Sequence, residues 1–319
     1  MVQHYVVFLL GRILEMATIT ISHLTKDYGH GRGVFDVNAV VEQGQCYGFL
    51  GPNGAGKTTT IRHLMGFSKP MKGKTAIADM DSWTHAAEIK NLVGYLPGEI
   101  ALPSGQTGIQ FLEMMEKMRL EKNDVYLKSL LERFELDPDV DTKRMSLGVK
   151  RKLAVVTAFM HDPAILILDE PTSGLDPIMQ QTFIDFILNE KKRGKTIFLS
   201  SHIFREVDAT CDRISIIKDG KIVSEFDPVQ LRKESDRIFR VTLGDRASFD
   251  QLTHQPFQFS SINPEKQRAR VRIHGDELNA LIAAIADLNV AEFQEFPFTL
   301  EDYFMQFYKE DKQFEGVRG

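Results

Sequence analysis

A glycine-rich loop in the first quarter of the chain has the residue types needed to hold a triphosphate. Gly51, Gly56, Lys57 and Thr58 meet the pattern Gly-x-x-x-x-Gly-Lys-Thr. Glycines let a backbone wrap closely around an anion, so that its N–H groups converge on the phosphates. In this pattern the lysine reaches the β- and γ-phosphates, and the threonine hydroxyl binds Mg²⁺. The sequence therefore predicts a nucleotide-binding loop formed by Gly51, Pro52, Asn53, Gly54, Ala55, Gly56, Lys57, Thr58 and Thr59.

Two adjacent carboxylates could complete the chemistry. Asp169 and Glu170 directly follow the wholly apolar segment 165–168. Such a run is typical of a buried parallel strand, and ligands bind at the carboxyl edge of parallel sheets. Asp169 would bind Mg²⁺ directly or through water, and Glu170 would act as the general base that polarises the attacking water. Alone, Glu170 would more simply be an acid at a helix N-terminus. The phosphate-binding pattern elsewhere in the chain favours the catalytic role.

The segments around these residues predict an α/β fold, a P-loop NTPase core with a parallel sheet. Residues 45–50 indicate a strand that runs straight into the glycine loop, and residues 60–65 begin a helix. Residues 164–168 and 196–200 are short apolar runs typical of central strands. A strand, a glycine loop and a helix in this order are the context that supports a phosphate-binding loop.

Further segments extend this core on both sides. Residues 18–24 and 34–41 predict strands of an N-terminal antiparallel β part, and an Asp-Gly turn predicts a hairpin over 214–224. Helical spacing over 107–136 and 146–160 predicts a helical insert at about 98–160, and residues 178–192 predict another helix. Beyond Asp227-Pro228, strands at 238–243 and 269–273 and a helix at 276–288 predict a small C-terminal α+β domain. The expected domains are therefore 16–227 and 228–319.

The composition of the chain excludes some classes of protein. The chain has 319 residues and a formal net charge of -5, which argues against a protein that binds nucleic acid through bulk electrostatics. Cys46 and Cys211 are its two cysteines, and two reduced thiols in a cytosolic protein are the favoured interpretation. No apolar run reaches the ~20 residues of a spanning helix. Residues 1–15 are expected to lie outside the fold, with a short membrane-surface segment as the alternative.

These motifs together resemble the nucleotide-binding subunit of an ATP-binding cassette (ABC) transporter, over roughly residues 17–225. The loop at 51–59 matches the Walker A motif, and residues 165–170 match the Walker B strand. Tyr28 resembles the aromatic residue that stacks on adenine. Residues 173–176, which end in Asp176, resemble the D-loop that contacts the other subunit, and His202 resembles the switch histidine that senses the γ-phosphate. Residues 298–304 resemble a box near the end of ABC-2-type export subunits, although an amphipathic helix from Thr299 explains them nearly as well.

Two segments depart from the family's pattern. The usual Leu-Ser-Gly-Gly-Gln loop reads Met-Ser-Leu-Gly-Val at 145–149, which keeps Ser146 and Gly148. As an N-cap, Ser146 would point a helix N-terminus at a γ-phosphate. The glutamine expected after the strand at 92–97 is replaced by Gly98-Glu99. Glu99 would substitute as a contact to Mg²⁺ or water, or the role is lost.

The resemblance implies an ATPase with ATP and Mg²⁺ as cofactors. Two copies would form a head-to-tail dimer in which Lys57 and Thr58 of one subunit face Ser146, Gly148 and Asp176 of the other. Glu170 would activate water and His202 would orient it. A separate membrane permease would form the pore, so the subunit is expected to be cytoplasmic and peripheral on the inner face of the membrane. Export of an unknown substrate is the leading interpretation. The alternatives are a soluble ABC-type ATPase and a regulatory protein that binds ATP.

Overall fold

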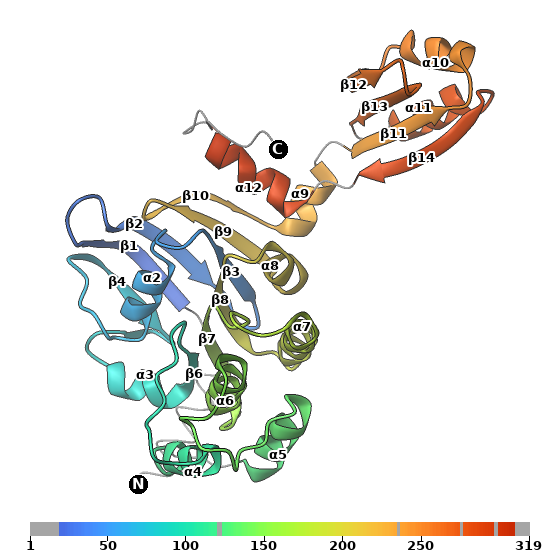
Figure 1. The fold of residues 1–319 in the computed structure, drawn as a ribbon. Helices are drawn as coiled ribbons and strands as arrows, with labels where there is room; N and C mark the ends of the chain where they lie inside the picture. The colour runs from blue at the N-terminus through green and yellow to red at the C-terminus, as the bar shows by residue number, and fades with distance from the viewer. Residues whose placement is uncertain (1–18, 120–122, 235–236, 275–276, 297–298, 310–319) are drawn as a thin grey trace. The chain divides into compact units, whose positions relative to one another are not determined.

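The chain forms two compact units, residues 1–226 and residues 227–319 (Figure 1). The computed structural model describes residues 19–119, 123–234, 237–274, 277–296 and 299–309. The expected extension at 1–15 lies outside the described residues.

A six-stranded sheet forms the centre of the first unit. Its order is β10-β9-β3-β8-β7-β6, and all neighbours are parallel except the β9–β10 hairpin at the edge. Every residue of β3, β7 and β8 is buried, which explains their largely apolar sequences. The six strands are β3 (Cys46–Leu50), β6 (Val93–Leu96), β7 (Ile165–Asp169), β8 (Thr196–Ser201), β9 (Arg213–Lys218) and β10 (Lys221–Phe226).

A second, antiparallel sheet belongs to the same unit and has the order β2-β1-β4-β5. Buried and exposed residues alternate along much of β2, as expected for a sheet with one covered face. The strands are β1 (Ile19–Asp27), β2 (Gly33–Val41), β4 (Lys72–Ile77) and β5 (Met80–Asp81). The parallel core and the N-terminal antiparallel part predicted from the sequence are thus both confirmed.

Side-chain caps fix the beginnings of the insert helices. Thr107 and Gln110 form a capping box at α4, Asn123 caps α5, and the Ser146 Oγ accepts from Val149 N at 3.3 Å at the start of α6. Helices α4 and α5 both contact α6. The helices among the described residues of the unit are α2 (Lys57–Leu64), α3 (Ala86–Leu92), α4 (Gly108–Lys117), α5 (Asp124–Arg133), α6 (Leu147–Phe159), α7 (Pro177–Lys192) and α8 (Phe204–Thr210). Among the described residues, no helix is both long and apolar enough to cross a membrane.

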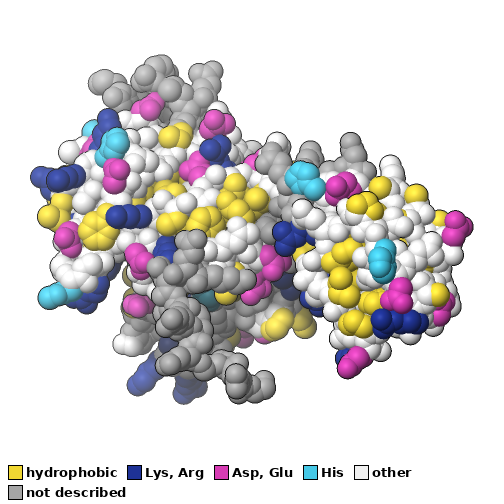
Figure 2. Space-filling view, turned by 90° about the horizontal axis from the view of Figure 1, so that it is seen from above, with side chains coloured by type: hydrophobic (Ala, Val, Ile, Leu, Met, Phe, Trp, Pro, Cys, Tyr) yellow, Lys and Arg dark blue, Asp and Glu magenta, His cyan; other side chains and the backbone are white. Residues whose placement is uncertain are grey.

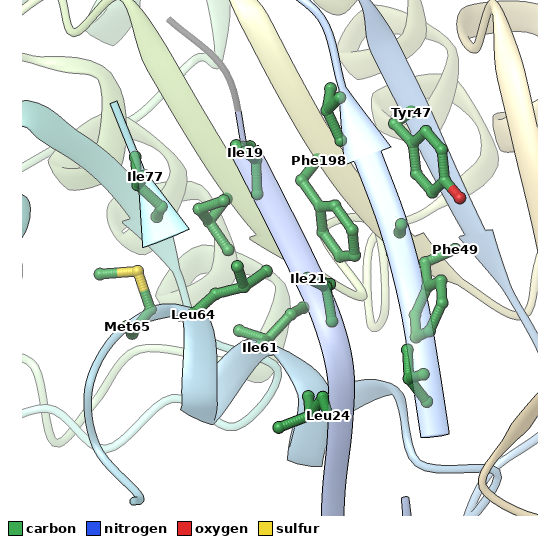
Figure 3. Close-up of a cluster of buried hydrophobic side chains, with 14 of the residues drawn as sticks. Ile19, Ile21, Leu24, Tyr47, Phe49, Ile61, Leu64, Met65, Ile77 and Phe198 are labelled. Atoms are coloured by element: carbon green, nitrogen blue, oxygen red, sulfur yellow. The ribbon is translucent and has the colours of Figure 1, made fainter. Parts of the chain in front are cut away.

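Helix α2 is anchored in a core cluster shared by both sheets (Figure 3). Its Ile61 and Leu64 are fully buried and belong to one cluster with Ile21 of β1, Phe49 of β3 and Phe198 of β8. Because α2 begins at Lys57, this packing fixes the position of the loop that precedes it.

The second unit is an antiparallel sheet with the order β12-β13-β11-β14 and two helices. The succession β-α-β-β-α-β and this order are those of a ferredoxin-like motif. Its elements are β11 (Arg237–Leu243), α10 (Arg246–Thr253), β12 (Gln258–Asn263), β13 (Arg268–Ile273), α11 (Glu277–Ile285) and β14 (Val290–Phe296), flanked by α9 (Pro228–Glu234) and α12 (Leu300–Lys309). An α+β appendage was predicted, but β12, β14 and α10 were not.

Charged side chains of both signs are interspersed on the face of the molecule shown in Figure 2. This mixture agrees with the small formal net charge of -5. Hydrophobic side chains appear among them in small groups, as on most protein surfaces.

We expect Ile61→Ala to destabilise the first unit by about 2–5 kcal/mol, because it removes a fully buried side chain that anchors α2. Trp83, the single tryptophan, lies in the first unit, so its fluorescence during urea unfolding reports that unit. Leu281→Ala is the matched control, since Leu281 is fully buried in the core of the second unit. An equal shift of the Trp83 transition by both variants would contradict the division into separately packed units.

Candidate active site

The glycine loop lies between β3 and α2, as the sequence predicts. Gly56 adopts φ 111° and caps α2, a conformation that favours glycine. At Gly51 a Cβ would lie 2.5 Å from the carbonyl oxygen of Ile217, so β9 leaves no space for a side chain there. The loop is therefore held tightly against the sheet, while Pro52, Asn53 and Gly54 are exposed at its tip.

Lys57 is buried and bonded on several sides. Its Nζ donates to the carbonyl oxygens of Gly51 at 2.6 Å and Pro52 at 3.0 Å. The same nitrogen lies 2.9 Å from Glu170 Oε1, an ion pair in which both side chains are largely buried. The ammonium group is thereby positioned between the loop and the end of β7, at the helix N-terminus where an anion is favoured.

Asp169 ends β7 and is fully buried beside Thr58. Its Oδ2 accepts from the Thr58 hydroxyl at 2.8 Å, and its Oδ1 accepts from Ser200 Oγ at 2.5 Å. Burial raises the pKa of Asp169, although the hydrogen bonds from Ser200 and Thr58 oppose this rise. The predicted pair of metal-binding oxygens is thus brought together, from segments 111 residues apart.

Glu170 follows with a backbone conformation that is uncommon outside glycine, φ 50°. Such conformations cost about 1–3 kcal/mol and cluster at functional sites. The turn directs the side chain between Lys57 and His202, whose Nδ1 lies 2.5 Å from Glu170 Oε2. Glu170 N also donates to the carbonyl oxygen of Ser200 at 3.0 Å, which ties the residue to β8.

Ser146, Gly148 and Asp176 lie on neighbouring helix starts. A Cβ at Gly148 would be 3.3 Å from the carbonyl oxygen of Gly174, so α6 begins close to the turn before α7. Asp176 is the N-cap of α7, and its Oδ1 accepts from Ile178 N and Met179 N, each at 3.0 Å. These backbone hydrogen bonds lower the pKa of Asp176. Within this chain, Asp176 therefore has a structural role at the helix start.

Tyr28 and Glu99 are both exposed. Tyr28 lies between β1 and β2, is 50% exposed, and has the ammonium of Lys26 5.7 Å from its ring centroid. It is therefore accessible to a planar ligand. It is Gly98, not Glu99, whose backbone lies beside Asp169, since a Cβ at Gly98 would be 3.0 Å from Asp169 Oδ2. The contact of Glu99 with a metal or its water stays a prediction.

Four buried polar residues near the site were given no role from the sequence. Ser200 bonds Asp169, and Ser201 Oγ donates to Glu206 Oε2 at 2.6 Å. Burial raises the pKa of Glu206 to about 8, and the charge of Glu170 adds to this rise. Arg151 of α6 is also buried. The only sequence signal for Glu206 is its place one helical turn after His202, on the short helix α8.

Comparison with known proteins agrees with this geometry. Residues 34–173 match the family model of the ABC transporter. The chain is 33% identical to the bacitracin transport ATP-binding protein BcrA of Bacillus licheniformis, over 90% of this chain and 96% of the relative. It is also 33% identical to the Nod factor export ATP-binding protein I of Burkholderia lata, over 67% of this chain and 72% of that protein.

A solved structure of an ATP-binding subunit of an ABC transporter has the same fold. It superposes with a TM-score of 0.61 at 26% sequence identity and covers 67% of this chain and 92% of that chain. The chain belongs to the ABC transporter ATP-binding proteins. It is an ATPase subunit that binds ATP and uses its hydrolysis to power transport.

We expect Lys57→Ala to weaken ATP binding at least about 100-fold, because it removes a charge-assisted contact to the phosphates and takes the cation away from Glu170 Oε1. Isothermal titration calorimetry measures the effect. Lys74→Ala, which removes an exposed lysine from β4, is the control for charge loss. Undiminished affinity in Lys57→Ala would contradict the assignment of the phosphate site.

The raised pKa of Glu206 predicts a pH-dependent stability. From about pH 4.5, its ordinary pKa, to about pH 8, the folded state binds more protons than the unfolded state. The free energy of unfolding therefore falls as pH rises through this window. Over this pH window we expect the free energy of unfolding of Glu206→Gln to fall less than that of wild type. The difference should exceed about 1 kcal/mol, roughly the free energy of a shift of one pKa unit. Urea unfolding followed by Trp83 fluorescence at several pH values measures it, with the exposed Glu113→Gln as control. Parallel pH profiles for wild type and Glu206→Gln would refute the role of burial.

Proposed function

We propose that this subunit works as a head-to-tail dimer that sandwiches two Mg-ATP molecules and powers export through a separate membrane permease. The observation that carries the proposal is the convergence of Lys57, Thr58, Asp169 and Glu170 at one edge of the sheet. The subunit would lie in the cytoplasm, peripheral on the inner face of the membrane. The names of the relatives, bacitracin transport and Nod factor export, support an export function.

The donor set fits Mg²⁺. Thr58 and Asp169 offer a hydroxyl and a carboxylate oxygen 2.8 Å apart. Mg²⁺ prefers such hard oxygen ligands and is often bound by one or two protein groups together with substrate phosphates. A closed cage of three or more protein ligands is not needed, and none of the histidines, cysteines and acids described forms one. When bound, the ion would neutralise charge on the β- and γ-phosphates.

Glu170 is the proposed general base and His202 its orienting partner. The carboxylate of Glu170 contacts Lys57 through one oxygen and His202 through the other. A carboxylate held in this way can accept a hydrogen bond from the attacking water and remove its proton during attack on the γ-phosphorus. His202 is partly exposed, so it can also reach a phosphate oxygen at the same edge.

Exposed apolar residues beside the candidate trans contacts support the dimer. Leu147, next to Ser146, is 63% exposed, and Ile178, close to Asp176, is 80% exposed. Large apolar side chains at such levels of exposure are often covered at interfaces. In the proposed dimer they would be covered by the partner, while Ser146, Gly148 and Asp176 approach its bound ATP.

An apolar pocket near β6 and α4 supports a permease partner. It has a volume of about 420 Å³, and its lining includes Phe67, Tyr95, Phe111, Met115 and Met118. Phe67 and Met118 remain exposed at its border. Apolar grooves of this kind receive helices of partner proteins, and methionines adapt to varied partners. The pocket also borders Pro97, next to Gly98 beside Asp169, so a helix seated there would lie close to the nucleotide site.

We expect Glu170→Gln to retain ATP binding but to hydrolyse ATP at least about 100-fold more slowly, the usual scale of general-base catalysis. Phosphate release by the purified subunit and calorimetry measure the two properties. Because hydrolysis reopens the dimer, Glu170→Gln should also remain dimeric in Mg-ATP, which light scattering detects. Asp185→Asn, a change at an exposed acid of α7, is the control.

Equal rates of phosphate release by wild type and Glu170→Gln would contradict the assignment of Glu170 as the general base. A Glu170→Gln protein that stays monomeric at saturating Mg-ATP would argue against the sandwich.

A further inference from the structure

Arg151 on α6 makes an unusual set of contacts for a buried side chain. It is only 3% exposed. Its Nε donates to the carbonyl oxygen of Ser173 at 2.9 Å, its Nη1 to that of Pro97 at 3.0 Å, and its Nη2 to that of Gly98 at 2.7 Å. One guanidinium therefore ties α6 to the segment that follows β6 and to the segment that follows β7.

Both tied segments border the candidate catalytic carboxylates. Gly98 approaches Asp169 so closely that a Cβ would lie 3.0 Å from Oδ2. Ser173 N donates to the carbonyl oxygen of Glu170 at 3.1 Å, which closes the turn after β7. A shift of either segment would thus change the surroundings of Asp169 or the strained backbone of Glu170.

The charge of Arg151 also faces the site. Burial lowers the pKa of Arg151, whereas the negative charges of Asp169, Glu170 and Glu206 oppose this. The guanidinium nevertheless remains charged, as arginine does throughout the accessible pH range. A buried charge carries a desolvation cost of several kcal/mol. The neighbouring inward positions of α6, such as Leu153 and Val155, are apolar, so packing alone does not require a cation here.

We propose that Arg151 is a positioning residue for ATP hydrolysis. Its planar fork holds the 97–98 segment and Ser173 in the places that set the geometry of Asp169 and Glu170. Since α6 begins at the N-cap Ser146, the same guanidinium connects the candidate contact to the partner's ATP with the carboxylates of its own subunit. This connection between subunits rests on the proposed dimer, whereas the local positioning requires only hydrolysis at this site.

Arg151→Lys and Arg151→Gln test the proposal in the full-length chain. Lysine keeps the charge but cannot span three carbonyls, and glutamine keeps amide donors without the charge. We expect both variants to lower kcat about 10- to 100-fold, the scale of a small misplacement of catalytic groups. The Kd for Mg-ATP, measured by calorimetry, should change by less than about threefold, because no phosphate contact is removed. Amide hydrogen exchange at 93–98 and 171–176 should become faster.

Arg193→Gln is the control, because Arg193 is also an arginine held by several partners, Asp162 and Glu190, but lies outside the nucleotide site. It should lower thermal stability while leaving kcat per folded molecule within about twofold of wild type. The proposal fails if both Arg151 variants keep wild-type kcat, or if kcat and ATP affinity fall together. Either result differs from failure of the proposed function, in which Glu170→Gln would release phosphate as fast as wild type.

Discussion

The carboxyl ends of adjacent parallel strands determine where this protein can do chemistry. Strand β8 lies between β3 and β7, and its backbone carbonyls bind both neighbours: Gly51 N donates to Ser201 O at 3.2 Å, and Glu170 N donates to Ser200 O at 3.0 Å. The phosphate loop and the proposed catalytic carboxylates are thus fixed to one strand. Together with the packing of α2, this register brings Thr58 against Asp169.

Charge balance is the second constraint on the site. Three acids, Asp169, Glu170 and Glu206, lie buried or nearly so in a small region, and two cations, Lys57 and Arg151, face them. Uncompensated buried charges are costly, and the acids outnumber the cations here. Burial raises the pKa of Glu206 to about 8, which favours the neutral form of this carboxyl group. The acids therefore have different environments, and only Glu170 is paired with both a lysine and a histidine.

The residues proposed for chemistry lie on a buried core, whereas the residues proposed to contact other subunits are exposed. Strands β7 and β8 pack into the buried cluster of Phe49 and Phe198, which also includes Ala55 of the phosphate loop. In contrast, α6 and α7 begin with exposed apolar residues, and an apolar pocket opens between β6 and α4. Arg151 connects these regions, because it belongs to α6 and its guanidinium donates to Ser173 and Gly98, in the segments next to the carboxylates. A subunit that couples hydrolysis to movement needs such a connection.

The sequence alone determined the parallel core and predicted the phosphate loop and the roles of Asp169 and Glu170, because these depend on local spacing and apolar runs. The tertiary structure decided which distant residues contact one another, because the spacing of residue types along the chain does not specify this. It showed that Gly98 is beside Asp169, that Glu206 is buried against Ser201, and that Arg151 spans two distant segments. Strands β12 and β14 were likewise missed, because weakly alternating edge strands are recognised only through their pairing with β13 and β11. Such contacts depend on burial between residues far apart in the chain, which only the fold specifies.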